Sequence, residues 1–502
     1  MKEKKIFDAL TEVREDYIDE ARTTMLKKQP FRWKKWTAIA ASLAVVLGIG
    51  IMMIQNGLPY GGSSEGGGAG HADGSIFMSY AGPVFPLTLS ETENDIIVDR
   101  NISYDFSLPD EESLRVWGAN VEDSYTLTNT SAEEKTVNAI YPFAGSFREL
   151  QKVLPTILVD GQQLSAKLYA GGYSGDFTGV YGADNPNGSE NILPLDSWEG
   201  YKALMEDGSY KRNAFSPYPD LPQKVTVYTF TDFEAPEEYD AATQAISFAI
   251  DPDKTTIMQY GFEGGEYRED GFRRFSYFVP DNEQWRRKTK LLIVLGDDIG
   301  DYTLQGYKDG GCEEGNELDG VSVTVTRSEQ ILSDVILKLI DDFFKQFDDD
   351  NKPAVSQEMF LGAVSEFFYQ YGLLSESVRD RYQYGMLEDI LSETDTLQRV
   401  FYLEFHVTIP AEGSVPVTAD LHKDPSYDFA CSGSNNEGIQ GYDMVTHLGS
   451  NLFFNKLTAE LISTENIDIV RQNCGFDLSQ GITKVELDPD LEHYYLEIRP
   501  VE

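Results

Sequence analysis

Residues 125–142, YTLTNTSAEEKTVNAIYP, indicate the class of the fold. Two runs in which apolar and polar residues alternate lie on either side of a polar turn. Alternation with a period of two is typical of strands that bury one face and expose the other. The stretch therefore predicts a β-hairpin with one face in a hydrophobic core.

The same rhythm of short strands continues along the chain. Further strands are predicted at residues 224–233, 245–250, 274–279, 290–296, 302–307, 321–327, 400–410, 415–420, 440–447, 456–462, 483–487 and 494–499. Many short strands separated by Gly, Asn and Asp turns favour β-sandwich architecture. We expect two such units, and no repeat of fixed period is visible.

Between these two strand-rich regions the apolar spacing becomes helical. Apolar residues three and four apart predict helices at about residues 328–347, 356–371 and 377–391. Ser356 is placed to cap the second helix, and Gly372 is placed to end it. We expect the aromatic stripes of these helices to lie in the core.

Residues 37–54, TAIAASLAVVLGIGIMMI, contain no charge and nearly match the roughly 20 apolar residues that cross a bilayer. Trp33 and Trp36 precede the run at the level expected for lipid headgroups. A cluster of basic residues also precedes it, formed by Lys27, Lys28, Arg32, Lys34 and Lys35. This asymmetry predicts a cytoplasmic N-terminus.

Two other interpretations of residues 37–54 are weaker. A core helix of this length normally carries a polar face. A cleaved signal peptide has a shorter basic region and a small-residue cleavage site after the apolar run. We therefore expect an uncleaved single-pass anchor in the cell membrane, with the C-terminal part of the chain outside the cell.

The predicted fold class is mainly β: a β-sandwich-like ectodomain with a helical insertion and one N-terminal transmembrane helix. An amphipathic helix is predicted at residues 6–25, and it has no core to cover in so short a cytoplasmic part. Its apolar face could meet a cytoplasmic partner, a second copy of itself or the inner leaflet; an equally good interpretation is a marginal helix that only tethers the chain. The predicted parts are a cytoplasmic segment (1–36), the transmembrane helix (37–54), a Gly-rich flexible linker (55–76), a β-rich extracytoplasmic region (77–327), a helical unit (328–393) and a β-rich C-terminal region (394–502).

Charge is distributed unevenly along the chain. Residues 1–36 contain 10 Lys+Arg and 7 Asp+Glu, a net charge of +3. The rest of the chain contains 31 Lys+Arg and 77 Asp+Glu, a net charge of −46, so the whole chain has a net charge of −43. So acidic a region disfavours nucleic acid as a partner. A hydrophobic content of 41% is enough for a folded core.

Cysteine usage gives little information on disulfides. Three cysteines are too few for a disulfide framework. Cys431 and Cys474 could pair outside the cell, and free buried thiols are an equally good interpretation. Cys312 lies in a Gly-Gly-Cys-Glu-Glu-Gly loop as an unexplained thiol.

Motifs for metal binding were tested against their spacing. No zinc-ligand spacing joins the five histidines, which are His71, His406, His422, His447 and His493. Residues 347–359 fail as an EF-hand, because Pro353 replaces the required Gly and Met359 the bidentate Glu. Small acidic groups at Asp297, Asp298 and Asp301, and at Asp488 and Asp490, could hold Ca²⁺, but in a chain with 84 carboxylates such groups arise by chance.

The sequence contains no complete motif for catalysis or for cofactor binding. Residues 172–175, GYSG, are followed by Asp176 where a nucleophile elbow requires Gly. The loop at residues 169–187 could bind sugar or simply turn. No phosphate-binding or dinucleotide-binding fingerprint is present. We therefore assign no catalytic, cofactor-binding or metal-binding residue and expect no cofactor.

Two stretches carry a resemblance to known proteins. KIFDALTEVREDYIDEA, followed by KKQPFRWKKWTAIAASLAVVLGIG, resembles the start of single-pass surface proteins of Gram-positive clostridial-type bacteria, some with the layout of membrane-anchored anti-sigma factors. The chain departs from the anti-sigma pattern, since it has no His/Cys zinc motif. The segments YTLTNTSAEEKTVNAIYPFAGSF and FYLEFHVTIPAEGSVPVTADL resemble hairpins of secreted β-sandwich domains. Neither resemblance implies catalytic residues.

The sequence thus predicts a non-enzymatic, membrane-anchored protein whose acidic ectodomain binds an extracellular ligand or envelope component. Its partners would be the lipid bilayer, through residues 37–54, and an extracellular ligand. A transmembrane regulator of the anti-sigma kind, with a cytoplasmic partner at residues 6–25, is one alternative. A surface hydrolase is the second.

Overall fold

The computed structural model describes residues 80–107, 118–172, 176–177, 192–193, 195, 197–237, 242–279, 289–347, 353–370, 373–374, 386–429 and 436–501. The predicted cytoplasmic segment, membrane span and linker, residues 1–76, lie outside these ranges. Within them, no helix combines the length and the apolar character needed to cross a bilayer.

The described chain is mainly β, as predicted, and its largest sheet has seven strands. Their order is β24 (Lys484–Leu487), β22 (Phe453–Ile462), β2 (Ile96–Asp105), β3 (Ala119–Asn129), β19 (Ser414–Lys423), β5 (Thr156–Val159) and β6 (Gln162–Leu164). Along β3, buried and more exposed residues alternate regularly from Ala119 to Asn129. One face of this sheet is therefore turned to the core and the other to solvent.

Two four-stranded sheets share cores with the seven-stranded sheet. One has the order β1 (Thr88–Leu89), β4 (Lys135–Gly145), β18 (Arg399–Ile409) and β7 (Lys167–Ala170). The other has the order β20 (Tyr427–Asp428), β21 (Gln440–Val445), β25 (His493–Pro500) and β23 (Ile467–Gln472). Leu127 and Phe405 belong to the first of these shared cores, and Leu457 and Tyr494 belong to the second.

The hairpin predicted at residues 125–142 is wrong. Both strands form, but β3 pairs with β2 and β19, whereas β4 pairs with β1 and β18 in a different sheet. The polar turn therefore carries the chain from one sheet to another across the core. Alternation reports which face of a strand is buried, and it is the same for two strands of one sheet and for two strands in facing sheets.

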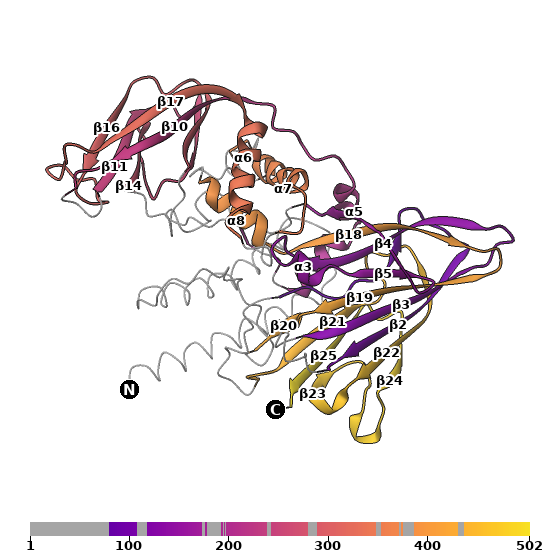
Figure 1. Cartoon of the computed structure of the whole chain (residues 1–502). Coiled ribbons are helices and arrows are strands. Elements are labelled where there is room, and N and C mark those ends of the chain that lie inside the picture. The colour runs from indigo at the N-terminus through magenta and orange to yellow at the C-terminus, as the bar shows by residue number, and fades with distance from the viewer. Residues whose placement is uncertain are drawn as a thin grey trace, which may run out of the picture. The chain divides into compact units, whose positions relative to one another are not determined.

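The sheets join the beginning and the end of the described chain. β4 pairs antiparallel with β18, β3 antiparallel with β19, and β2 parallel with β22. Figure 1 shows the purple β4 beside the orange β18. These pairings link the predicted regions 77–327 and 394–502, and the segment boundaries themselves stay predictions.

A second pair of sheets lies between β7 and β18 in the sequence. One sheet has the order β12 (Thr255–Tyr260), β15 (Lys290–Gly296), β10 (Lys224–Glu234) and β17 (Ser322–Ile331). The other has the order β13 (Gly264–Tyr267), β14 (Phe272–Val279), β11 (Ala242–Ala249) and β16 (Tyr302–Tyr307). Phe230, Leu292 and Phe275 contribute to the core that the two sheets share. A short pair, β8 (Asp176–Phe177) and β9 (Ile192–Leu193), precedes them.

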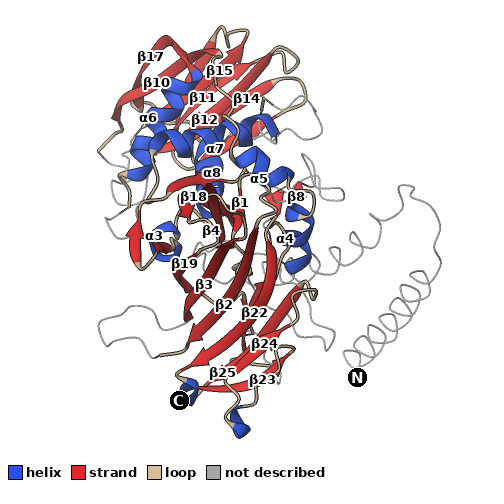
Figure 2. Ribbon diagram, turned by 90° about the vertical axis from the view of Figure 1, so that its right-hand side faces the viewer, coloured by secondary structure: helices blue, strands red, loops and turns tan. Residues whose placement is uncertain are grey.

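Helices α6 (Leu332–Phe344), α7 (Gln357–Gln370) and α8 (Leu387–Thr396) follow β17. They share a core with Val225 of β10 and Ile293 of β15, so they cover the second face of that sheet. Figure 2 shows them between that sheet and β18. The short helices α3 (Leu150–Val153), α4 (Trp198–Met205) and α5 (Ser209–Ala214), and the 3-10 turns η2 (Thr464–Asn466) and η3 (Leu478–Gln480), complete the described elements.

The structure corrects two helix boundaries. The first helix begins at Leu332 instead of residue 328, because residues 328–331 pair with β10 as part of β17. The predicted cap of the second is confirmed, since the Ser356 hydroxyl accepts from the Met359 amide at 3.1 Å. Residues 377–385 of the third predicted helix and the predicted stop at Gly372 lie outside the described ranges. The described part of the third helix, α8, continues to Thr396, five residues beyond its predicted end.

Candidate functional site

The first ten described residues, 80–89, form an extended segment that we call the N-terminal strap. Its apolar side chains are almost fully buried, with exposed fractions of 4% for Tyr80, 2% for Val84 and 0% for Phe85 and Leu87. Towards the N-terminus, the chain continues from the strap into the predicted linker and membrane span. Any connection between residues 37–54 and the fold therefore enters through a buried segment.

Backbone hydrogen bonds join the front of the strap to the start of β20 and to β21. The Ala81 amide donates to the Ser426 carbonyl at 2.8 Å, and the Val84 amide to the Asp443 carbonyl at 2.9 Å. The Val445 amide donates back to the Val84 carbonyl at 2.9 Å. The strap thus lies beside the start of β20 and along strand β21.

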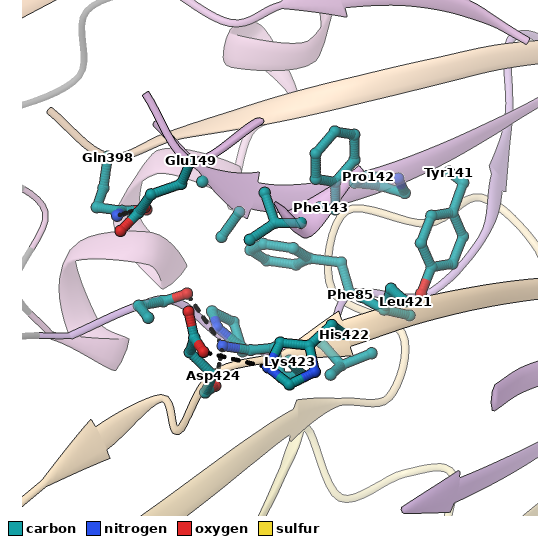
Figure 3. A pocket seen from close by; sticks show the side chains of 16 residues that line it. Phe85, Tyr141, Pro142, Phe143, Glu149, Gln398, Leu421, His422, Lys423 and Asp424 are labelled. Atoms are coloured by element: carbon teal, nitrogen blue, oxygen red, sulfur yellow. Dashed lines mark hydrogen bonds and ion pairs between the residues drawn. The ribbon is translucent and has the colours of Figure 1, made fainter. Parts of the chain in front are cut away.

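A small cleft lies against residues 81–85 of the strap (Figure 3). Its enclosed part has a volume of about 20 Å³, room for about one water molecule. Phe85, Tyr141 and Phe143 give it an apolar wall. Its labelled polar side chains are Glu149, Gln398, His422, Lys423 and Asp424.

Lys423, the last residue of β19, is the most unusual group at this cleft. It is 7% exposed, and its Nζ donates to the carbonyl oxygens of Ala81 at 3.1 Å and Asp424 at 2.8 Å. Burial lowers the pKa of Lys423 to about 8, against a weaker opposing effect of nearby carboxylates led by Asp424. Within the described part of the chain, no carboxylate forms an ion pair with this ammonium group.

The ammonium group of Lys423 has one N–H more than it has acceptors among the described residues. An ammonium carries three N–H donors, and two carbonyls account for two of them among the described residues. A desolvated lysine beside a cleft is the kind of perturbed group that marks binding and catalytic sites. An acceptor oxygen that entered the cleft would satisfy the remaining donor.

Polar pairs line the rim of the cleft. His422 Nε2 lies 3.3 Å from Asp424 Oδ1 on one side. On the other, Gln398 Nε2 donates to Glu149 Oε2 at 2.9 Å, and the Ser146 hydroxyl donates to the same oxygen at 3.1 Å. The rim is therefore fixed by side-chain hydrogen bonds, which favours a preformed site.

A second buried polar cluster fixes the first residue of the strap. The Tyr80 hydroxyl donates to Asp443 Oδ2, and His493 Nε2 lies 3.0 Å from Asp443 Oδ1. The Trp198 ring stacks on the His493 ring with centroids 4.6 Å apart. The Ser426 hydroxyl accepts from the Asp443 amide at 3.0 Å and donates to the Gly82 carbonyl at 2.8 Å. Its proton is therefore directed to the strap and not to a base.

Two of the carboxylates singled out in the sequence accept hydrogen bonds from protein donors. Asp298 accepts from the Tyr228 hydroxyl at 2.7 Å and from Arg327 Nε at 2.8 Å. Asp488 Oδ1 accepts from the Asp490 amide at 2.9 Å. No group of three or more potential metal ligands occurs within the described ranges.

The remaining sequence candidates are dispersed. Cys312 and Cys474 are free thiols, and burial raises the pKa of Cys474 to about 12, so this thiol is protonated at neutral pH. Cys431 and His71 lie outside the described residues, and so does most of the loop at 169–187. Of the described histidines, only His422 lies at the cleft.

Sequence reasoning missed Lys423, although a signal for it exists. The inward-facing register of β19 runs through Val417 and Ala419, and two steps of the same register lead to Lys423. A lysine in the buried register of a strand is an exception to the usual exposure of this residue. Glu149 and Gln398 offer no such signal, because they follow short irregular segments.

Comparison with known proteins identifies no relative: no family model, no curated protein and no solved structure matches the chain. The fold and the cleft therefore define the class on their own: a mainly β protein with an internal cleft beside its buried N-terminal strap.

Proposed function

We propose that this chain is a single-pass membrane protein whose β-sandwich-like ectodomain binds an extracellular ligand or envelope component without enzymatic activity. The uncharged run at residues 37–54 and the basic residues before it support the anchor and its orientation. The ligand site is the cleft at Lys423. The ligand presents an acceptor oxygen, such as a carboxylate, to that residue.

The observation that carries this proposal is the spare donor of a buried ammonium group. Burying a charge without a partner is costly, and Lys423 has only carbonyl acceptors among the described residues. Hydrogen bonds between an ammonium group and an anionic oxygen are about twice as strong as neutral ones. An anionic ligand group therefore offsets a cost that the free protein carries.

The binding step is tested with formate, the smallest carboxylate, on the full chain in detergent. Thermal unfolding is followed as formate replaces chloride at constant ionic strength. The proposal predicts that formate raises the midpoint of the wild type but not of Lys423→Met, while Lys484→Met, which removes an exposed lysine, responds like the wild type. Equal responses of the wild type and Lys423→Met would contradict it.

The location is tested separately in intact cells stripped of their wall. External protease should digest the ectodomain and leave a fragment that contains residues 1–54, and deletion of residues 37–54 should move the protein out of the membrane fraction. Protection of the ectodomain until the cells are lysed would contradict the orientation.

A further inference from the structure

The cleft and the strap share one donor group, which couples them. Lys423 Nζ faces the cleft and also donates to Ala81 O at 3.1 Å. In the sequence, the strap is preceded by the predicted linker, residues 55–76, and the predicted membrane span, residues 37–54. A ligand that changes the bonding of Lys423 therefore acts on the first described residues after the predicted linker.

We infer that an anion bound at Lys423 clamps the front of the strap, residues 80–84, onto the fold. Occupancy of the cleft thereby determines how tightly the segment next to the predicted linker is held. The inference rests on the proposed binding at this cleft. It describes how that site is linked to the membrane side of the chain.

The direction of the effect follows from the number of donors. The two carbonyls already occupy two of the three N–H groups, so an anion takes the third and displaces neither. The added negative charge also favours the charged form of Lys423. A charged donor makes the stronger bond to Ala81 O, so the strap is held more tightly with the ligand than without it.

The two ends of the strap are fixed by different residues. At the front, the Ser426 hydroxyl donates to the Gly82 carbonyl at 2.8 Å. At the rear, Asn451 Oδ1 accepts from the Leu89 amide at 2.9 Å, and Asn451 Nδ2 donates to the Leu89 carbonyl at 3.1 Å. Among the described residues, only the front end shares a donor with the cleft, so the clamp should act on residues 80–84 and leave Leu89 unchanged.

Linkage requires the coupling to be reciprocal. If formate tightens the front of the strap, a variant that loosens this end binds formate less well. Ser426→Ala removes a front contact, and Tyr80→Phe removes another if the first variant folds poorly. Asn451→Ala removes only rear contacts and serves as the matched control.

Hydrogen exchange on the full chain in detergent, with and without formate, tests the inference. We expect formate to slow exchange of the Ala81 and Val84 amides by about two- to tenfold, the worth of one hydrogen bond, with no change at Leu89. Lys423→Met should abolish the effect. Ser426→Ala should weaken formate binding by a similar factor, and Asn451→Ala should not.

The failures are distinguishable. A thermal shift with formate but unchanged or faster exchange at residues 81–84 would overturn the clamp and leave the binding site standing. The absence of any formate response would overturn both. Equal loss of formate affinity in Ser426→Ala and Asn451→Ala would also overturn the clamp, because the effect would then be general destabilisation.

Discussion

Lys423 at the end of β19 donates across the core to the carbonyl of Ala81, a residue 342 positions earlier in the chain. The bond joins the last residue of β19 to the strap, which follows the predicted linker in the sequence. Its donor is a buried cation, and its acceptor is a neutral carbonyl. The fold thus keeps an ion in its interior without a counter-ion among the described residues.

The pH dependence of stability should reveal this ion. The pKa of Lys423 is about 8 in the folded chain and about 10.5 when unfolded, so between these values the unfolded chain binds more protons. The free energy of unfolding therefore rises with pH from about 8 upward, by at most about 1.4 kcal/mol per pH unit. Denaturant unfolding should show this gain in the wild type and in Lys484→Met. The gain should be absent in Lys423→Met.

The strap should tolerate no side chain at Gly82. Its φ is +74°, and an added Cβ would lie 2.3 Å from Ala144 Cβ. Gly161 has a φ of +72° with nothing within 4 Å, so Gly161→Ala isolates the backbone cost of about 1 kcal/mol. Gly82→Ala should cost about 2–4 kcal/mol in urea unfolding, because a clash is added to the backbone cost. Equal costs for the two variants would mean that the strap is not packed as described.

The buried pair Arg100 and Asp123 should show strong coupling. Asp123 accepts from Arg100 Nε and Nη2 at 2.8 Å each and from the Tyr125 hydroxyl at 2.6 Å. Asp123→Asn leaves a guanidinium unpaired in the core and should cost about 3–5 kcal/mol. Arg100→Met with Asp123→Asn should cost clearly less than the sum of the single variants. Additive costs in this cycle would show that the pair is not a unit.

Asn129 should be essential where the chain changes sheets. It is fully buried, and its Nδ2 donates to the carbonyls of Glu133 at 2.7 Å and Pro410 at 3.2 Å, which joins two crossing turns. Asn129→Asp keeps the acceptor but loses these donors, and should cost about 2–4 kcal/mol. Asn138→Asp on β4, where the side chain is only half-buried, should cost less than about 0.5 kcal/mol. Thermal unfolding of both variants checks the difference.

Individual elements follow from local sequence. The predicted bounds of the strands at 290–296 and 302–307 coincide with β15 and β16, because the glycines and aspartates that bound these strands act within a few residues. Helix starts are less certain. The helical apolar pattern that begins at Ile331 predicts a start near residue 328, yet pairing with β10 keeps residues 328–331 extended.

Strand partners and the cleft do not follow from local sequence. No residue near 130–134 indicates that β4 pairs with β18 instead of β3, because β18 lies more than 250 residues away in the sequence. The cleft depends on the same long-range pairings, which bring Lys423 to Ala81 and Glu149 to Gln398. The sequence carries one clue, a lysine in a buried register, and no clue to its neighbours.

The most direct test of the central claim is the ionisation of Lys423 itself. NMR of the full chain labelled with ¹³C at the lysine side chains follows the Cε resonance of Lys423, which is assigned by its loss in Lys423→Met. The account predicts a pKa of about 8 without ligand and a higher pKa with formate. A value near the ordinary 10.5 of lysine that formate does not change would contradict the claim that a buried ammonium at this cleft awaits an anion.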